Sequence, residues 1–347
     1  MTSLGVVFRP QLPPERLRGL ARTADEAGLD ELWLWEDCFL ESGIASAAAA
    51  LAWTERLRVG IGLLPVPLRN IALTTMETAT LRRLFPGRFA VGLGHGVQEW
   101  MGQVGARVDS PVTLLREHLT AMRALLRGER VTTKGRYVML DDVALDWPPQ
   151  GAAAQQSTTA VPGHPSAGPD HSSAESDPSA KAGPAAGAGP FPGTGGTGPS
   201  SVVPLAYRDA AVLAGARGPR SLQLSGEAAD GTVLDASTSV DGIRHARHLV
   251  DEGRRTAGRT GPHEVVHYLN TATGPGAADR LRAERARQGL DPVTGPGVAG
   301  DAAAVAEAVV RAAEAGAGTV VLQPTADEPD PEGFVRFAAR EVRPLLP

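Results

Sequence analysis

The sequence predicts an α/β fold in which eight parallel strands alternate with helices and close into a (β/α)8 TIM barrel. Eight short apolar runs recur along the chain, and nearly all are separated by longer amphipathic segments. Strands joined by helical crossovers run parallel, and eight such units form a barrel of about 250 residues before insertions. A doubly wound open sheet is the alternative, but it usually has fewer strands and a glycine-rich first turn, whereas the first turn here reads FRPQLPP.

The first half of the chain supplies four of the expected strands and four helices. In the first helix Leu17, Leu20 and Ala24 share one face, and Gly28 is a typical residue to end it. In the other segments, too, a short run of apolar residues is followed by a segment in which apolar residues recur at helical spacing. The expected strands are 4–8, 31–35, 57–64 and 87–94, and the expected helices are 14–27, 43–53, 70–83 and 112–126.

The second half repeats this pattern after a stretch of different composition. Residues 151–200 contain 40 Gly, Ala, Pro, Ser or Thr among 50, too few large apolar side chains to offset the entropy of ordering them, so we expect a disordered insertion. Segments 1–150 and 201–347 then form one barrel domain together. The expected strands are 211–216, 231–236, 264–270 and 318–324, and the expected helices are a short one after 216, then 240–257, 277–288 and 301–315.

Composition narrows the class of function. A net charge of −5 argues against a nucleic-acid binder held by bulk positive charge. The single cysteine, Cys38, excludes an intrachain disulfide and any multi-cysteine metal site, and it favours a reducing compartment. The histidines have no metal-ligand spacing, so we expect no metal. Neither a secretory signal nor a membrane-spanning run is visible, so we expect a cytoplasmic protein.

In a parallel barrel the chemistry belongs at the carboxyl ends of the strands. Position alone therefore selects a set of candidate residues and segments. They are Phe8 and Arg9, Glu36 to Cys38, 62–65, 92–99, 215–219, 235–237, Asn270 and Gln323.

Three of these segments carry groups suited to chemistry, each with an ordinary structural alternative. WEDCF (35–39) places two acids and a thiol at the rim, although Asp37 is also a common helix cap and Cys38 a common buried residue. GLGHGVQEW (92–100) lets backbone approach a ligand beside His95, Gln98 and Glu99, but it is neither a Walker motif nor a convincing dinucleotide loop. GARGPRSL (215–222) offers an anion site at a helix start, or a plain turn.

The run from Arg58 to Trp100 resembles the bacterial luciferase-like oxidoreductases, in its strand ending, its helix with A-T-L and its GRF and G-x-G-x-G strings. ADEAGLDELWLWEDCF, GARGPRSLQLSGEAADGTVL and VAGDAAAVAEAVVRAAEAGAGTVVLQP match further family blocks in the family's order. The resemblance implies a TIM barrel that binds coenzyme F420 or reduced FMN at its mouth, and this chain looks closer to the F420-dependent branch. It also implies a homodimer and a small-molecule substrate.

The resemblance assigns roles residue by residue. Gly62 and Leu63 match a bulge with a non-prolyl cis peptide behind the cofactor ring, which also contacts the residue matching Gln98. Asp37 and Cys38 match positions near the ring. Gly94 lies in the G-x-G-x-G string, at a strand end where backbone can approach a ligand closely. The position matching His95 is often a carboxylate that transfers a proton. Ala214, Gly215 and Ala216 match backbone beside the cofactor's polyol and phosphate.

Two departures from the family pattern affect these roles. Many relatives have a histidine where Cys38 stands, and a neutral thiol is a weak donor. Relatives of the F420 type often have a phosphate-binding lysine after strand six, where this chain reads DASTS. Arg217, or the helix start at Gly300 and Asp301, is the substitute that this sequence offers.

The resulting hypothesis is hydride transfer between F420 and a small organic substrate, with His95 as the leading acid or base and Glu99 and Asp37 as second choices. An FMN-dependent monooxygenase that uses O2 is the first alternative. A barrel that binds or assembles without catalysis is the second.

Overall fold

The computed structural model describes residues 2–149 and 203–347 of the chain. Eight parallel strands in this part form a closed ring in the order β1-β2-β3-β4-β7-β8-β9-β11, and β11 pairs with β1. The predicted (β/α)8 barrel is therefore confirmed. The ring strands are β1 (Ser3–Val7), β2 (Glu31–Leu34), β3 (Arg58–Pro65), β4 (Phe89–Gly94), β7 (Leu213–Gly215), β8 (Gly231–Leu234), β9 (Glu264–Ala272) and β11 (Thr319–Pro324).

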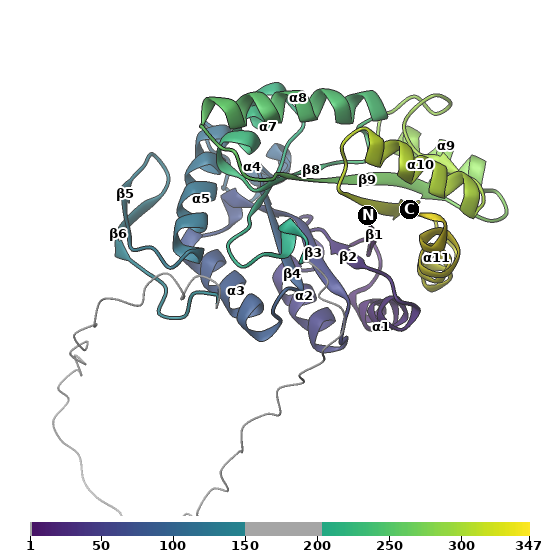
Figure 1. Ribbon diagram of the computed structural model, residues 1–347, viewed down its shortest axis with the longest axis horizontal. Helices are drawn as coiled ribbons and strands as arrows, with labels where there is room; N and C mark the ends of the chain where they lie inside the picture. The colour runs from purple at the N-terminus through teal and green to yellow at the C-terminus, as the bar shows by residue number, and fades with distance from the viewer. Residues whose placement is uncertain (1, 150–202) are drawn as a thin grey trace, which may run out of the picture. The chain divides into compact units, whose positions relative to one another are not determined.

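Helices surround the ring of strands on its outside (Figure 1). Most of them follow a strand as the sequence predicts, and their apolar faces contribute to the core around the strands. They are α1 (Leu17–Ala27), α2 (Gly43–Ala52), α3 (Ile71–Leu84), α5 (Pro111–Leu126), α7 (Pro219–Ala228), α8 (Val240–Thr256), α9 (Ala277–Arg287) and α10 (Ala302–Glu314).

The inside of the barrel is packed with side chains. Trp33 of β2 is fully buried there, and it shares the interior with aliphatic residues of β1, β8, β9 and β11. Gly60 of β3 accommodates it, because a Cβ at that position would lie 2.7 Å from the indole ring. Tyr207 of the short turn η3 (Leu205–Tyr207) fills the end at which the strands begin, with its ring 5.3 Å from the Arg58 guanidinium.

Several short elements go beyond the sequence prediction. β5 (Val131–Lys134) and β6 (Met139–Val143) form an antiparallel hairpin after α5, where the sequence analysis expected no strand. Glu117 of α5 holds this hairpin, because its carboxylate accepts hydrogen bonds from the backbone N–H groups of residues 136–138. The further elements are α4 (Gln98–Gln103), β10 (Val298–Ala299), the 3-10 helices η1 (Pro14–Arg16) and η2 (Val66–Leu68), and α11 (Pro331–Phe337), which is followed by the π-helix η4 (Ala338–Val342) and the 3-10 helix η5 (Arg343–Leu345).

The expectation of disorder at 151–200 concerns residues outside the described part of the chain. Strands on either side of that gap pair directly, since β4 lies beside β7 with Gly92 opposite Leu213. Within the residues described, no helix is both long enough and apolar enough to cross a membrane.

Candidate active site

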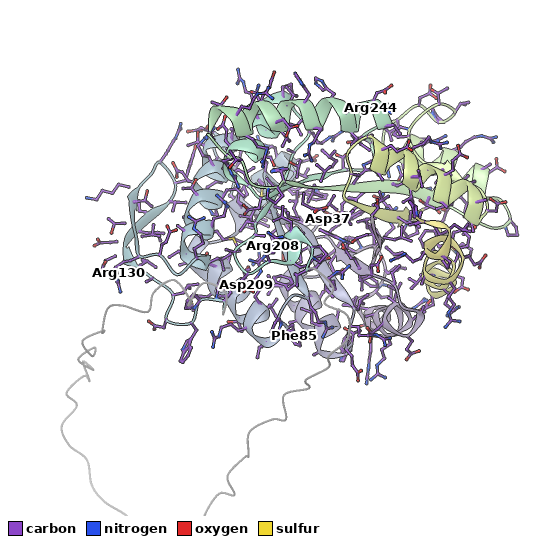
Figure 2. All side chains as sticks on the ribbon, in the orientation of Figure 1. Asp37, Phe85, Arg130, Arg208, Asp209 and Arg244 are labelled. Atoms are coloured by element: carbon purple, nitrogen blue, oxygen red, sulfur yellow. The ribbon has the colours of Figure 1, made fainter. Side chains whose placement is uncertain are left out.

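The carboxyl ends of the eight strands meet at one rim, as expected for a parallel barrel. β3 lies between β2 and β4 in the ring. Asp37 follows β2 and His95 follows β4, so the two candidate acid–base residues flank the end of β3. In Figure 2 Asp37 lies near the middle of the view, whereas Arg130 and Arg244 lie at its margins.

The end of β3 leaves the regular strand ladder at Gly62 and Leu63. The pairing with β4 shifts between Ile61 and Leu64, and the predicted cis peptide bond joins Gly62 to Leu63. The Leu63 side chain then lies across the ends of the next two strands. A Cβ at Gly94 would come within 2.5 Å of it, and one at Gly215 within 2.1 Å, so a side chain at either position would force Leu63 to move. Leu63, Gly94 and Gly215 are thus brought together.

Asp37 is half-buried, and its carboxylate forms no hydrogen bond with the described residues. Burial raises its pKa above the usual value, and the positive charge of Arg9 opposes that rise. Arg9 is held in place by Glu284, at 2.7 Å, and by the carbonyl of Pro324, at 2.9 Å. Its guanidinium also lies 5.7 Å from the centre of the Trp35 ring. Asp37 is therefore a carboxyl group that can gain or lose a proton near the rim.

His95 has a defined tautomer. Its Nδ1 lies 3.2 Å from the carbonyl oxygen of Pro111, which can only accept, so Nδ1 carries the proton and Nε2 keeps its lone pair. Burial lowers the pKa of His95. A neutral imidazole with a free accepting nitrogen is suited to take a proton from a substrate hydroxyl.

Gln98 and Glu99 open helix α4 beside His95, and they differ in placement. The Gln98 amide donates to the carbonyl of His95 at 3.1 Å, which fixes this turn. Glu99 is exposed on the first turn of the helix. Of the two, Gln98 is placed to support the loop that carries His95.

Cys38 is partly buried next to Asp37. Burial and the neighbouring carboxylates of Asp37 and Glu36 raise the pKa of its thiol, so the thiolate is disfavoured. Glu36 has a structural role, since it accepts from Arg69 at 2.8 Å and from the backbone N–H of Gly43 at 2.8 Å. A second cis peptide bond, which the sequence analysis did not foresee, joins Cys38 to Phe39.

The residues that the sequence offered for the cofactor's phosphate have few charged groups free to bind it. Ala214, Gly215 and Ala216 are buried at the end of β7, but Arg217 is 74% exposed and pairs with Asp235 at 2.9 Å. The alternative helix start is capped internally, because the Asp301 carboxylate accepts from the N–H of Ala304 at 3.0 Å. A phosphate at α10 would meet that negative charge, whereas Arg217 at α7 could turn toward one.

One residue at this site was missed by sequence reasoning. Tyr268 of β9 donates a hydrogen bond to the carbonyl oxygen of Gly62 at 3.0 Å, from 206 residues away. The sequence signal was its spacing: Tyr268 lies two residues after Val266 in the same strand, so both side chains point into the barrel. Among the described residues there is no cluster of three or more His, Cys, Asp or Glu that could hold a metal ion.

Comparisons with known proteins identify the family. The model of the luciferase-like monooxygenase family matches residues 4–321. The chain belongs to this family. A curated relative is the 5,10-methylenetetrahydromethanopterin reductase of Methanolobus tindarius, 25% identical over 76% of this chain and 62% of its own length. The matched region thus spans about three-fifths of that relative.

Solved structures share the fold. The coenzyme F420 dependent tetrahydromethanopterin reductase of Methanopyrus kandleri superposes with a TM-score of 0.73 at 18% identity, covering 100% of this chain and 99% of that one. The oxygenating constituent of 3,6-diketocamphane monooxygenase from Pseudomonas putida, in complex with FMN, gives a TM-score of 0.63 at 16% identity, covering 100% and 99%.

Proposed function

We propose that this luciferase-like protein is an oxidoreductase that transfers hydride between coenzyme F420 and a small organic substrate. The observation that carries the proposal is the Gly62–Leu63 segment, with Leu63 lying over two glycine strand ends between Asp37 and His95. This surface is apolar and partly exposed, and it suits one face of a planar ring. F420-dependent proteins among the relatives support the choice of cofactor.

When bound, a deazaflavin supplies the hydride donor or acceptor, and the residues of this chain supply position and a proton. Leu63, whose side chain lies over Gly94 and Gly215, forms the surface for the ring. His95 Nε2 would accept the hydroxyl proton when an alcohol is oxidised, and the same imidazole would return that proton in the reverse direction. Asp37, whose pKa is raised by burial, is the second acid–base candidate at this rim. Arg217 of the β7–α7 loop is the residue that we assign to the cofactor's phosphate.

Titration of the purified full-length chain with F420 and with FMN tests this proposal. We expect F420 to bind with a micromolar or lower Kd and its visible absorbance to shift on binding. Tighter binding of FMN would instead support the monooxygenase, which relatives such as the FMN complex also allow. If neither cofactor binds below about 100 µM, a level at which binding energy is only about 5 kcal/mol, the non-catalytic barrel is favoured.

Replacing His95 separates its chemical role from folding. We expect His95→Ala to lower kcat by about 100-fold or more, because a general base contributes on that scale, with little change in the Kd of F420. Glu99, a second candidate from the sequence, is exposed in the first turn of α4, so Glu99→Ala should retain wild-type kcat. Unchanged turnover in His95→Ala would exclude it as the acid–base group.

We further propose that the chain forms a homodimer through α3. Leu73, Met76 and Leu84 are exposed on this helix at spacings that place them in one stripe, with exposed fractions of 51%, 57% and 66%. Light scattering should give twice the mass of the chain for the wild type and the monomer mass for Met76→Glu. A monomeric wild type contradicts the proposal.

A further inference from the structure

Tyr268 connects the far wall of the barrel to the candidate ring surface. β9 and β3 are not neighbours in the ring, yet the Tyr268 hydroxyl reaches the Gly62 carbonyl at 3.0 Å. The rest of the tyrosine is clamped by two indole rings. Its centroid lies 6.1 Å from that of Trp33, edge to face, and 5.8 Å from that of Trp35.

The Gly62 carbonyl depends on this bond. Because the pairing of β3 with β4 is interrupted between Ile61 and Leu64, the carbonyl of Gly62 falls outside the regular ladder. A buried carbonyl left without a donor costs about 1–3 kcal/mol. The approach is also close enough to require glycine, since a Cβ at residue 62 would lie 2.2 Å from the Tyr268 hydroxyl oxygen.

The neighbouring residue, Leu63, is fixed from two other directions. Its carbonyl accepts from the backbone N–H of Glu36 at 3.3 Å, which ties it to the end of β2. Its side chain lies over Gly94 and Gly215 on the other side. Tyr268 thus provides the support from below for a segment whose sides are already held, and burial raises the pKa of its phenol so that it remains a donor.

We propose that Tyr268 is a positioning residue for the cofactor ring: it sets the height and tilt of the Gly62–Leu63 segment through its hydrogen bond to the Gly62 carbonyl. The proposal rests on the proposed function, because it takes that segment as the ring surface. Tyr268 acts through the backbone and not on the reacting atoms, because its hydroxyl donates its hydrogen bond to the Gly62 carbonyl.

The test compares Tyr268→Phe with Tyr207→Phe in the full chain. Both tyrosines are buried in the same interior cluster, but Tyr207 fills the opposite end of the barrel. In Tyr268→Phe we expect the amides of residues 62–64 to exchange with solvent at least 5-fold faster without cofactor. We also expect the Kd of F420 to rise 5- to 10-fold and the absorbance maximum of bound F420 to move. Tyr207→Phe should match the wild type in all three measurements.

Each result decides one question. Wild-type exchange at residues 62–64 in Tyr268→Phe would show that the bond does not hold the segment, and the proposal would be wrong. Faster exchange with an unchanged Kd and spectrum would also overturn it, because the segment would then not govern the ring. If the wild type binds neither F420 nor FMN, the proposed function fails, while the exchange data still establish whether Tyr268 positions this segment. Equal effects of both substitutions would reduce Tyr268 to a packing residue.

Discussion

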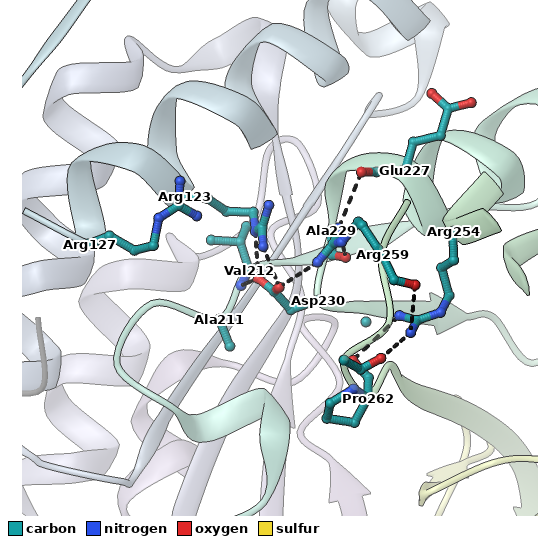
Figure 3. A network of polar contacts seen from close by, with 12 residues as sticks. Arg123, Arg127, Ala211, Val212, Glu227, Ala229, Asp230, Arg254, Arg259 and Pro262 are labelled. Atoms are coloured by element: carbon teal, nitrogen blue, oxygen red, sulfur yellow. Dashed lines mark hydrogen bonds and ion pairs between the residues drawn. The ribbon is translucent and has the colours of Figure 1, made fainter. Parts of the chain in front are cut away.

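Replacing Asp230 with alanine should lower the free energy of unfolding by about 3 kcal/mol, the scale expected when one partner of a mostly buried ion pair is removed. Asp230 lies just before β8, and its carboxylate joins two arginines from distant elements (Figure 3). Arg123 of α5 donates two hydrogen bonds to it, at 2.8 and 2.7 Å, and Arg259 donates a third at 2.8 Å.

The backbone around Asp230 adds to this effect. Its carboxylate also accepts from the N–H of Val212, and its own N–H donates back to the Val212 carbonyl at 2.8 Å. The Asp230 carbonyl accepts from Glu264 at the start of β9. The side chain therefore links the start of β7 to Arg259 and to a helix from before residue 150, whereas the two backbone–backbone bonds remain in the alanine variant. Without the carboxylate, two guanidinium groups remain with fewer partners in a mostly buried place.

Urea unfolding at pH 7 measures the predicted change. Asp241→Ala is the matched control, because Asp241 pairs with Arg244 on the exposed side of α8, where such pairs contribute little. The arginines hold the pKa of Asp230 below its usual value, so its stabilisation is present at neutral pH and is lost as pH falls through that lowered pKa. The difference in the free energy of unfolding between the wild type and Asp230→Ala should therefore shrink in acid. A loss below about 1 kcal/mol at pH 7 would contradict the prediction.

The Asp230 cluster also illustrates where sequence reasoning stops. The eight strands and eight main helices were predictable because each carries its own period of apolar residues, and the structure differs from their expected ends by only a few residues. Arg123 and Asp230 are 107 positions apart in the sequence, so no local pattern predicts that they form a pair. The hairpin β5–β6 was missed for a related reason: the turn between its strands is held by the carboxylate of Glu117 on another element.

At the candidate site the same division holds. Positions at strand ends were predictable from the fold, and the resemblance supplied the cis peptide at Gly62–Leu63, which the structure contains. The internal capping of α10 by Asp301 and the pairing of Arg217 with Asp235 were not visible, since they depend on side-chain direction. The hydrogen bond from Tyr268 to Gly62 was not visible either, because it forms only when the sheet curves into a barrel and brings opposite strands within reach of one side chain.

The second large effect concerns acids buried at the opposite end of the barrel. Glu31 at the start of β2 is fully buried, and its carboxylate accepts from the Trp33 indole at 2.8 Å. Glu264 at the start of β9 also points inward, near Thr319. Burial, with the nearby charge of Glu31, raises the pKa of Glu264 from 4.5 to about 7.

A raised carboxyl pKa makes the folded protein less stable as pH rises. Between pH 4.5 and 7 folded Glu264 holds a proton that the unfolded chain releases, so the free energy of unfolding falls across that window and levels off above it. Each pKa unit is worth about 1.4 kcal/mol, so the cost at pH 8 approaches about 3 kcal/mol. Glu264→Gln cannot ionise and should be more stable than the wild type by up to that amount at pH 8.

Unfolding midpoints measured from pH 4.5 to 8 test this expectation. The advantage of Glu264→Gln should shrink to nearly zero at pH 4.5, where wild-type Glu264 is protonated in the folded chain. Glu307→Gln, which alters an exposed acid paired with Arg311 on α10, should follow the wild type throughout. A constant difference across the whole pH range would instead assign the effect to packing, because only the titration of a buried carboxyl group makes the advantage appear between pH 4.5 and 7.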